Sequence, residues 1–199
     1  MAYHIEQVMP SLLEEEILYL RHRDNNTTGQ QGEFEVARYL CSQGYHVSEP
    51  KVDTGVDWMY FDPKNPRDVK LAQVKEIFRK EYEDVEKYKG EPYFVFQFQS
   101  GGGPQKRRHN RESHDVFFHT LLTPHRTLIF KMDSAMIPLK KGTNNFIQNK
   151  DARLDRSYTS PMEPQFYFKN FLVSAQYSPK VVEANQSFFN KSTLCKFMN

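Results

Sequence analysis

The sequence has few cysteines, no long apolar run and almost no net charge, and each shortage excludes a class of protein. Cys41 and Cys195 are the two cysteines in 199 residues, too few for a disulfide framework, so we expect free or buried thiols. No stretch is long and apolar enough to span a bilayer, and no apolar signal segment opens the chain. We therefore expect a cytoplasmic protein with no membrane partner.

Sequence motifs for several common chemistries are also missing. Neither a G-x-S-x-G nucleophile elbow nor a Walker-type glycine loop occurs, so serine-hydrolase and nucleoside-triphosphate chemistry have no support. No internal repeat or low-complexity tract divides the chain. A length of 199 residues suits one domain with a substantial core, and we expect a single domain over residues 1–199.

The most informative residues are a carboxylate and a Q-x-K triplet on two predicted neighbouring strands. Asp57 follows Gly55-Val56, and Gln73-Val74-Lys75 lies on the next strand. Residues two apart on a strand point to the same face, so Gln73 and Lys75 can both meet Asp57. A carboxylate, an amide oxygen and an ammonium at one place could hold a divalent cation beside an activated water, as phosphodiester hydrolysis requires.

A predicted amphipathic helix over residues 29–45 brings a second carboxylate. Threonines before it can cap its start, and Gly44 is a typical C-terminal stop. Glu33, Ala37 and Leu40 share its apolar stripe. A buried carboxylate is costly unless a cation meets it. A metal ion would explain Glu33, and a salt bridge to an Arg or Lys is the alternative.

These segments resemble the PD-(D/E)XK nuclease superfamily, in particular the branch with Q-x-K in the last motif, which includes Mrr-type restriction endonucleases and some homing endonucleases. The resemblance covers about residues 29–99, and its order and spacing are more specific than any one motif. It implies an α/β fold with a central mixed β-sheet flanked by helices, a restriction-endonuclease-like αβββαβ core with C-terminal additions. The matching runs are Gly29-x-x-Gly32-Glu33, Ala37-Arg38-Tyr39-Leu40, Gly44-Tyr45, Gly55-Val56-Asp57 and Gln73-Val74-Lys75.

The resemblance implies a Mg²⁺-dependent endonuclease that hydrolyses DNA, of restriction, homing or repair type, with Mn²⁺ as a substitute cation. Asp57, Gln73 and the backbone carbonyl of Val74 would hold the metal, with Glu33 reaching it directly or through water. Lys75 would lie beside the attacking water. The chain departs from the family pattern at Val56, where proline is usual, and at Gln73, where an acidic residue is usual.

The second departure has a chemical consequence. An amide oxygen can still ligate a hard cation, and Glu76 is expected to point to the opposite face of the strand, so we expect one tightly held metal ion instead of two. The alternative is a catalytically inactive nuclease-fold subunit that binds DNA or takes part in assembly. An RNA-acting enzyme is a weaker hypothesis, suggested by the aromatic content alone.

The net charge is only +2, so binding to a phosphate backbone would depend on basic residues gathered on one face of the protein. The candidate is a glycine-rich loop with four cations: Lys106, Arg107, Arg108 and Arg111. One interpretation is a clamp on nucleic acid; an ordinary solvated loop is an equally good one. Because a duplex cutter usually needs two active sites, we expect a homodimer or a higher even-numbered oligomer.

The remaining pattern predicts a core over about residues 29–99, an N-terminal helix over 11–23 and a C-terminal elaboration over 112–199. Strand 93–98 is rich in aromatic residues, which favours a buried sheet over a surface that stacks bases. Four histidines, His109, His114, His119 and His125, crowd one region, but their spacing fits no metal motif, so we expect surface or packed histidines. Further predicted helices cover 79–89, 113–122 and 181–190, and further strands cover 45–47, 57–61, 69–75, 127–132 and 165–173.

Overall fold

The computed structural model describes residues 12–22, 25–51, 55–81, 92–98, 113–137, 139, 149–153 and 171–186. The helices in these ranges are α1 (Glu14–His22), α2 (Asn25–Ser42), α3 (Pro179–Ala184) and a 3₁₀ turn over Ser134–Met136. The strands are β1 (His46–Ser48), β2 (Trp58–Phe61), β3 (Lys70–Glu76), β4 (Phe78–Glu81), β5 (Pro92–Gln97), β6 (Val116–Thr123), β7 (Arg126–Asp133), β8 (Asn149–Arg153) and β9 (Leu172–Tyr177).

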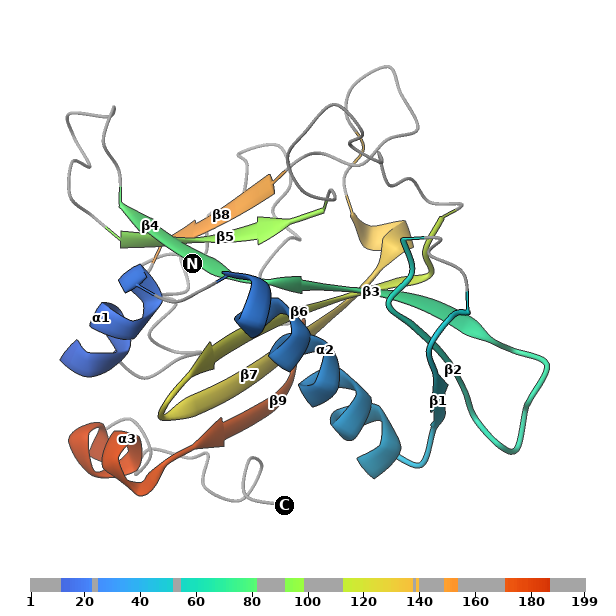
Figure 1. Ribbon diagram of the computed structural model, residues 1–199, viewed down its shortest axis with the longest axis horizontal. Helices are drawn as coiled ribbons and strands as arrows, with labels where there is room; N and C mark the ends of the chain where they lie inside the picture. The colour runs from blue at the N-terminus through green and yellow to red at the C-terminus, as the bar shows by residue number, and fades with distance from the viewer. Residues whose placement is uncertain are drawn as a thin grey trace, which may run out of the picture.

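A six-stranded mixed sheet forms the centre of the fold, with α2 crossing in front of it (Figure 1). Its strand order is β1-β2-β3-β6-β7-β9, and β3 and β6 are its parallel pair. A second sheet of order β4-β5-β8 lies on the other side of β3 from the β7–β9 edge in the view of Figure 1. The predicted α/β fold with a central mixed sheet flanked by helices is therefore confirmed.

Helix α2 covers one face of the central sheet, and the residues that it buries are Gly32, Val36 and Leu40, which recur every four residues. Of the predicted stripe, Leu40 is buried, whereas Glu33 and Ala37 are only partly buried. A side chain at Gly32 would place its Cβ 2.6 Å from Oγ1 of Thr120 on β6, so glycine is what allows the helix to lie this close. The helix ends at Ser42, and Gly44 takes a φ of +85°, the left-handed conformation typical of a helix stop.

The opposite face of the sheet packs against α1 and β5. Phe94, Phe96 and Phe98 from β5 and its end join Phe117 and Phe130 of the central sheet in one buried cluster. The prediction that the aromatic strand belongs to the core is confirmed. These rings are at most 2% exposed, so they have no free face on which a base could stack.

A buried ion pair fastens α1 to the turn between β6 and β7. Arg126 donates from Nε and Nη2 to the Glu16 carboxylate, at 2.6 Å in each case, and both side chains are fully buried. The backbone N–H of Leu13 and the hydroxyl of Thr123 donate to the same carboxylate. The pair lies 110 residues apart in sequence, and removing one partner of such a pair typically costs about 3–5 kcal/mol.

Two predicted helices are wrong in type. Residues 116–122 of the helix predicted over 113–122 belong to strand β6, because a strand buried on both faces has a continuous apolar run without strand-like alternation. The strand predicted over 93–98 is present as β5 and lies in the second sheet, whereas β6 is the parallel partner of β3. Residues 79–81 of the helix predicted over 79–89 belong to strand β4, and the rest of that helix lies outside the described residues.

The C-terminal half contributes to the centre of the fold. Strands β6, β7 and β9 supply three of the six strands of the main sheet. Strand β7 matches the strand predicted over 127–132, whereas β9 begins later than the strand predicted over 165–173. Helix α3 is shorter than predicted and begins at Pro179. No helix in the described ranges is long and apolar enough to cross a membrane.

Candidate functional site

The site begins where β2 and β3 part. Backbone pairing of these strands runs from Tyr60↔Lys70 to Trp58↔Ala72, and the N–H of Asp57 still donates to the Ala72 carbonyl at 3.0 Å. Two residues earlier, Gly55 has a φ of +77°, which glycine adopts without strain. Beyond Ala72, no described strand pairs with β3 on this side, so the edge of Gln73-Val74-Lys75 faces side chains instead of backbone.

The carboxylate of Asp57 occupies this edge. Its Oδ2 accepts a hydrogen bond from the backbone N–H of Val74 at 2.6 Å and another from the side-chain amide of Gln73. The side chain of Asp57 thus accepts the Val74 N–H of β3 just beyond the point where backbone pairing with β2 ends. The structure thus brings Asp57 into contact with Gln73 and with the backbone of Val74.

The amide of Gln73 is held between two acceptors and leaves its own oxygen unused. Its Nε2 donates to the Asp57 carboxylate and lies 3.3 Å from the Val74 carbonyl oxygen. Its Oε1 is buried and has no hydrogen-bond partner, which costs on the order of 1–3 kcal/mol for a buried polar atom. Oxygens of Asp57, Val74 and Gln73 therefore belong to one small region, in which the Gln73 Nε2 and the Val74 N–H now donate to Asp57.

The charges of Asp57, Glu33 and Lys75 influence one another through their pKa values. Burial raises the pKa of Glu33 and the neighbouring Asp57 carboxylate raises it further, whereas Lys75 lowers it. Burial lowers the pKa of Lys75, against the opposing effect of Asp57 and Glu33. Each of the three charges therefore acts on the others, as groups close together in a partly buried site do. Such mutual perturbation is typical of functional sites.

The raised pKa of Glu33 gives a prediction about stability. A carboxyl group whose pKa is higher in the folded than in the unfolded chain stabilises the fold below its unfolded value, near 4.5, and loses that contribution as pH rises through the folded value. Without divalent cations, Glu33→Gln should therefore be more stable than the wild type at pH 8 and equal to it below pH 4. Urea unfolding at both pH values checks this. Glu35→Gln, which breaks the exposed ion pair with Arg38, is the control and should not gain stability.

Of the clustered histidines, His119 is the most deeply packed. His119 is fully buried among Phe96, Phe98 and Phe117, and its Nε2 donates to the Gln97 carbonyl at 2.7 Å. Burial lowers its pKa to about 3, so the ring is neutral at physiological pH. No group of three or more His, Cys, Asp or Glu that could hold a metal occurs among the residues that the structure describes.

The other two histidines of this group that can be placed have structural surroundings. His114 is buried against Phe117. His125 lies 2.8 Å from the Glu15 carboxylate and 3.2 Å from the Ser178 hydroxyl. His109 lies outside the described residues.

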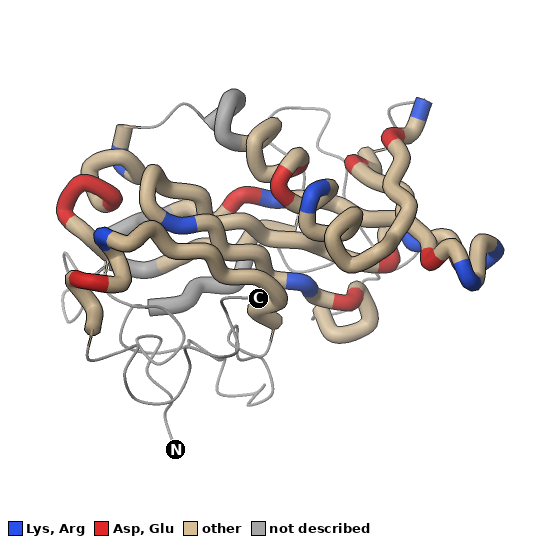
Figure 2. Tube along the Cα trace, turned by 90° about the horizontal axis from the view of Figure 1, so that it is seen from below, with Lys and Arg blue, Asp and Glu red and all other residues tan. Residues whose placement is uncertain are grey.

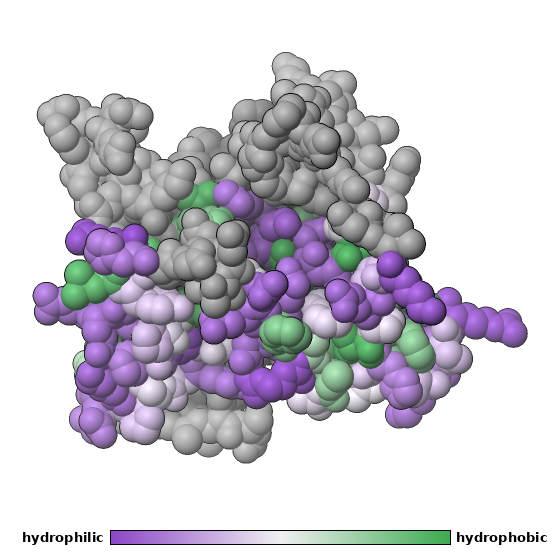
Figure 3. Space-filling model, viewed as in Figure 1, coloured by the Kyte–Doolittle hydropathy of each residue, from purple (hydrophilic) through white to green (hydrophobic). Residues whose placement is uncertain are grey.

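The predicted basic clamp, Lys106, Arg107, Arg108 and Arg111, also lies outside the described residues. Along the described trace, Lys and Arg alternate with Asp and Glu (Figure 2). The face shown in Figure 3 is mainly hydrophilic, with apolar side chains in small separate groups. Scattered apolar residues of this kind are normal on a monomer surface.

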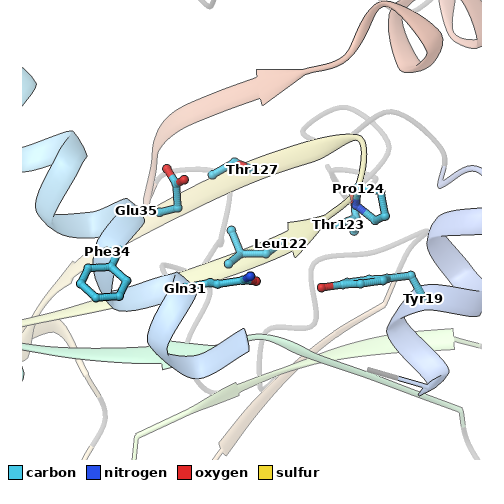
Figure 4. A pocket seen from close by; sticks show the side chains of 8 residues that line it. All are labelled: Tyr19, Gln31, Phe34, Glu35, Leu122, Thr123, Pro124 and Thr127. Atoms are coloured by element: carbon cyan, nitrogen blue, oxygen red, sulfur yellow. The ribbon is translucent and has the colours of Figure 1, made fainter. Parts of the chain in front are cut away.

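A cavity of about 370 Å³ lies between α1, α2 and the β6–β7 turn and is separate from the residues described above (Figure 4). Tyr19, Phe34, Leu122 and Pro124 give it an apolar lining, and Glu35 and Gln31 stand at its α2 side. None of Asp57, Gln73 or Lys75 contributes to it. The candidate site thus lies along one edge of a partly buried strand and not in this cavity.

The sequence interpretation did not single out Trp58. Its indole Nε1 donates to the backbone carbonyl of Glu33 at 3.0 Å, so it links the strand that carries Asp57 to the helix that carries Glu33. No local sequence pattern predicts this hydrogen bond, because its donor and acceptor residues are 25 positions apart. The hint in the sequence was that the single tryptophan directly follows Asp57.

Comparison with known proteins gives one structural similarity. No protein-family model matches the chain, and no curated protein has a significantly similar sequence. The fold is similar to that of a bacterial homing endonuclease, I-Ssp6803I, with a TM-score of 0.44 and 10% sequence identity over 85% of this chain and 98% of the other. At this level the similarity carries no argument about the site, which stands on its own residues and contacts.

Proposed function

We propose that this chain is a Mg²⁺-dependent endonuclease that hydrolyses DNA phosphodiester bonds, with Glu33, Asp57, Gln73 and Lys75 as its catalytic residues. The observation that carries the proposal is the placement of Asp57. Its carboxylate bonds to Gln73 and to the Val74 N–H, and its charge acts on both Glu33 and Lys75. These contacts and charge effects support a site shared by the two carboxylates, the amide and the lysine.

The donor set fits a hard divalent cation. Asp57, the Val74 carbonyl and the Gln73 Oε1 would hold the ion, with Glu33 as a nearby carboxylate, and oxygen donors of these kinds suit Mg²⁺ or Mn²⁺. The buried, unpartnered Oε1 of Gln73 is the atom that most needs such a ligand. When bound, the cation would lower the pKa of a coordinated water and offset charge on the scissile phosphate.

Lys75 and Glu33 have distinct tasks in this proposal. The ammonium of Lys75 stabilises the negative charge that develops on the phosphate, and its lowered pKa makes proton exchange with the attacking water easier. Glu33, whose pKa is raised by burial and by Asp57, supplies a second negative charge that favours cation binding.

Duplex DNA is the proposed substrate, and the biological role would be restriction, homing or repair. Both follow from the resemblance of the Glu33, Asp57 and Gln73-Val74-Lys75 motifs to those of nucleases. Cutting both strands needs two active sites, so a homodimer or a higher even-numbered oligomer is part of the proposal. Size-exclusion chromatography with light scattering tests the oligomer separately from cleavage.

One observation favours a second candidate, a nuclease-fold protein that binds DNA without cutting it. The amide NH₂ of Gln73 donates to Asp57 and approaches the Val74 carbonyl, so it lies against two oxygens that a cation would need. If the amide stays in this orientation, the site is closed to metal. The two candidate functions therefore differ in the orientation of the Gln73 amide: cation binding requires its oxygen, and not its NH₂ group, to face Asp57.

Gln73→Glu distinguishes the two candidates. The variant adds the missing carboxylate, which should strengthen Mn²⁺ binding by about tenfold or more and lower stability without metal, because two carboxylates then meet at one place. Plasmid cleavage with Mg²⁺ and with EDTA is measured for both proteins. If the wild type is an active nuclease, it should cut the plasmid with Mg²⁺ and not with EDTA. A wild type that binds DNA equally with and without Mg²⁺ and gives no product, with cleavage appearing only in the Gln73→Glu variant, would establish the inactive form.

A further inference from the structure

Trp58 makes a hydrogen bond that neither of its elements needs for its own structure. The indole N–H donates to the carbonyl of Glu33 at 3.0 Å. Glu33 is inside the 18-residue helix α2, where a backbone carbonyl already accepts the N–H four residues later. The bond is therefore additional to the helix ladder, and its effect is to connect α2 with β2.

The two ends of this connection carry the two carboxylates of the proposed site. Trp58 directly follows Asp57 and is paired in register with Ala72 of β3. Asp57 itself is tied to β3 through the Ala72 carbonyl and the Val74 N–H. The backbone of Asp57 is thus connected to the backbone of Glu33 through a single residue: the peptide bond to Trp58, the Trp58 side chain and its hydrogen bond to the Glu33 carbonyl.

Apolar packing alone would fix the position of Glu33 less well. Helix α2 rests on the sheet through Val36 and Leu40, and the indole of Trp58 packs against the same cluster. Hydrophobic contact is non-directional, so it sets how close the helix lies to the sheet more than how far it slides or turns. A hydrogen bond depends on both distance and angle and can fix those remaining movements.

We infer that Trp58 is a positioning residue that sets the separation of Glu33 and Asp57 and so prepares the site for a divalent cation. The inference rests on the proposed function. Its ligand is a divalent metal ion, and its action is indirect, since the indole contacts the backbone of Glu33 and not the reacting atoms. A purely structural role, in which the ring only fills space beneath α2, is the alternative that the experiment must separate.

The chain allows the N–H group to be removed without changing the ring. Trp58 is the single tryptophan, so growth of a tryptophan auxotroph on 3-benzothienylalanine replaces its N–H by sulfur at this one position. The replacement keeps the size and packing of the indole and removes its donor. Trp58→Phe, made by ordinary mutagenesis, serves as a second variant that also lacks the donor.

Mn²⁺ affinity, measured by electron paramagnetic resonance of the free ion, is the readout, in wild-type and Glu33→Gln backgrounds. If Trp58 acts through Glu33, loss of the N–H should weaken Mn²⁺ binding about twofold to tenfold in the wild-type background, the net worth of one hydrogen bond, and leave the Glu33→Gln protein unchanged. Equal losses in both backgrounds, or no loss in either, would overturn the inference, because a space-filling role does not depend on the Glu33 carboxylate.

A measurement without metal tests the hydrogen bond itself. The indole gives one side-chain N–H signal in a ¹⁵N-labelled sample, and its proton should exchange with water at least tenfold more slowly than that of free indole. Exchange at the free rate would overturn the inference whatever the metal result. A wild type that fails to bind Mn²⁺ would instead refute the proposed function, and with it the task that is assigned here to Trp58.

Discussion

Asp57→Asn is expected to reduce Mg²⁺-dependent cleavage by a factor of about a thousand. The variant keeps an oxygen that can accept the Val74 N–H, which the carboxylate now accepts at 2.6 Å, so the junction of β2 and β3 should survive. It loses the negative charge on which cation binding depends. Initial rates of plasmid nicking at saturating DNA, with Mg²⁺ varied from 0.1 to about 20 mM, measure the loss.

A second aspartate that bonds to a backbone N–H of β3, Asp115 just before β6, supplies the matched control. Asp115 accepts the backbone N–H of Leu71 at 2.8 Å, the same kind of side-chain contact that Asp57 makes to Val74. Asp115→Asn should therefore disturb the edge of β3 to a similar degree while leaving the proposed site intact. If the two variants lose equal activity, the effect of Asp57 is structural and the metal proposal is wrong.

DNA binding should move in the opposite direction from cleavage. Asp57→Asn removes a negative charge from the surface that would face a phosphate, so its affinity for duplex DNA should be unchanged or higher. A gel-shift titration in EDTA checks this for wild type, Asp57→Asn and Asp115→Asn. Loss of DNA affinity in the Asp57 variant alone would indicate that this aspartate supports the binding surface and not the chemistry.

The parts of the site that could be predicted are those set by short-range pattern. The period of α2 predicted Glu33 on the apolar stripe, where the structure leaves it partly buried, and alternation along β3 predicted Gln73 and Lys75 on one face. Asp57 was expected on the neighbouring strand, and β2 does pair with β3 beside it. Each of these inferences needs only a few neighbouring residues.

The parts that could not be predicted depend on partners distant in the chain. Strand β6 has seven consecutive buried residues, so no period separates it from a buried helix. Whether β5 or β6 pairs with β3 is decided by tertiary packing, because both strands are apolar. The buried Glu16–Arg126 pair and the Trp58–Glu33 bond join residues 110 and 25 positions apart, and the sequence has no local mark for either.

Lys75→Met is the second change with a large expected effect. Cleavage should fall by about a hundredfold or more, because no cation then offsets the charge that develops on the phosphate. Methionine keeps the length and apolar stem of lysine, so folding should be retained. Lys70→Met is the control on the same strand, since Lys70 pairs with the exposed Asp68 and is remote from Asp57 in the strand register. A similar loss in both variants would remove Lys75 from the mechanism.

The dependence of cleavage on pH separates two tasks of Lys75. Its pKa is lowered by burial, so the neutral amine becomes available below the pH at which an ordinary lysine, with a value of 10.5, loses its proton. If Lys75 accepts a proton from the attacking water, wild-type cleavage should rise with pH and level off before that value. Lys75→Arg keeps a positive charge but holds its proton throughout, so it should be inactive at every pH. An arginine variant that cuts at near wild-type rate would mean that the positive charge of Lys75 is required and its proton transfer is not.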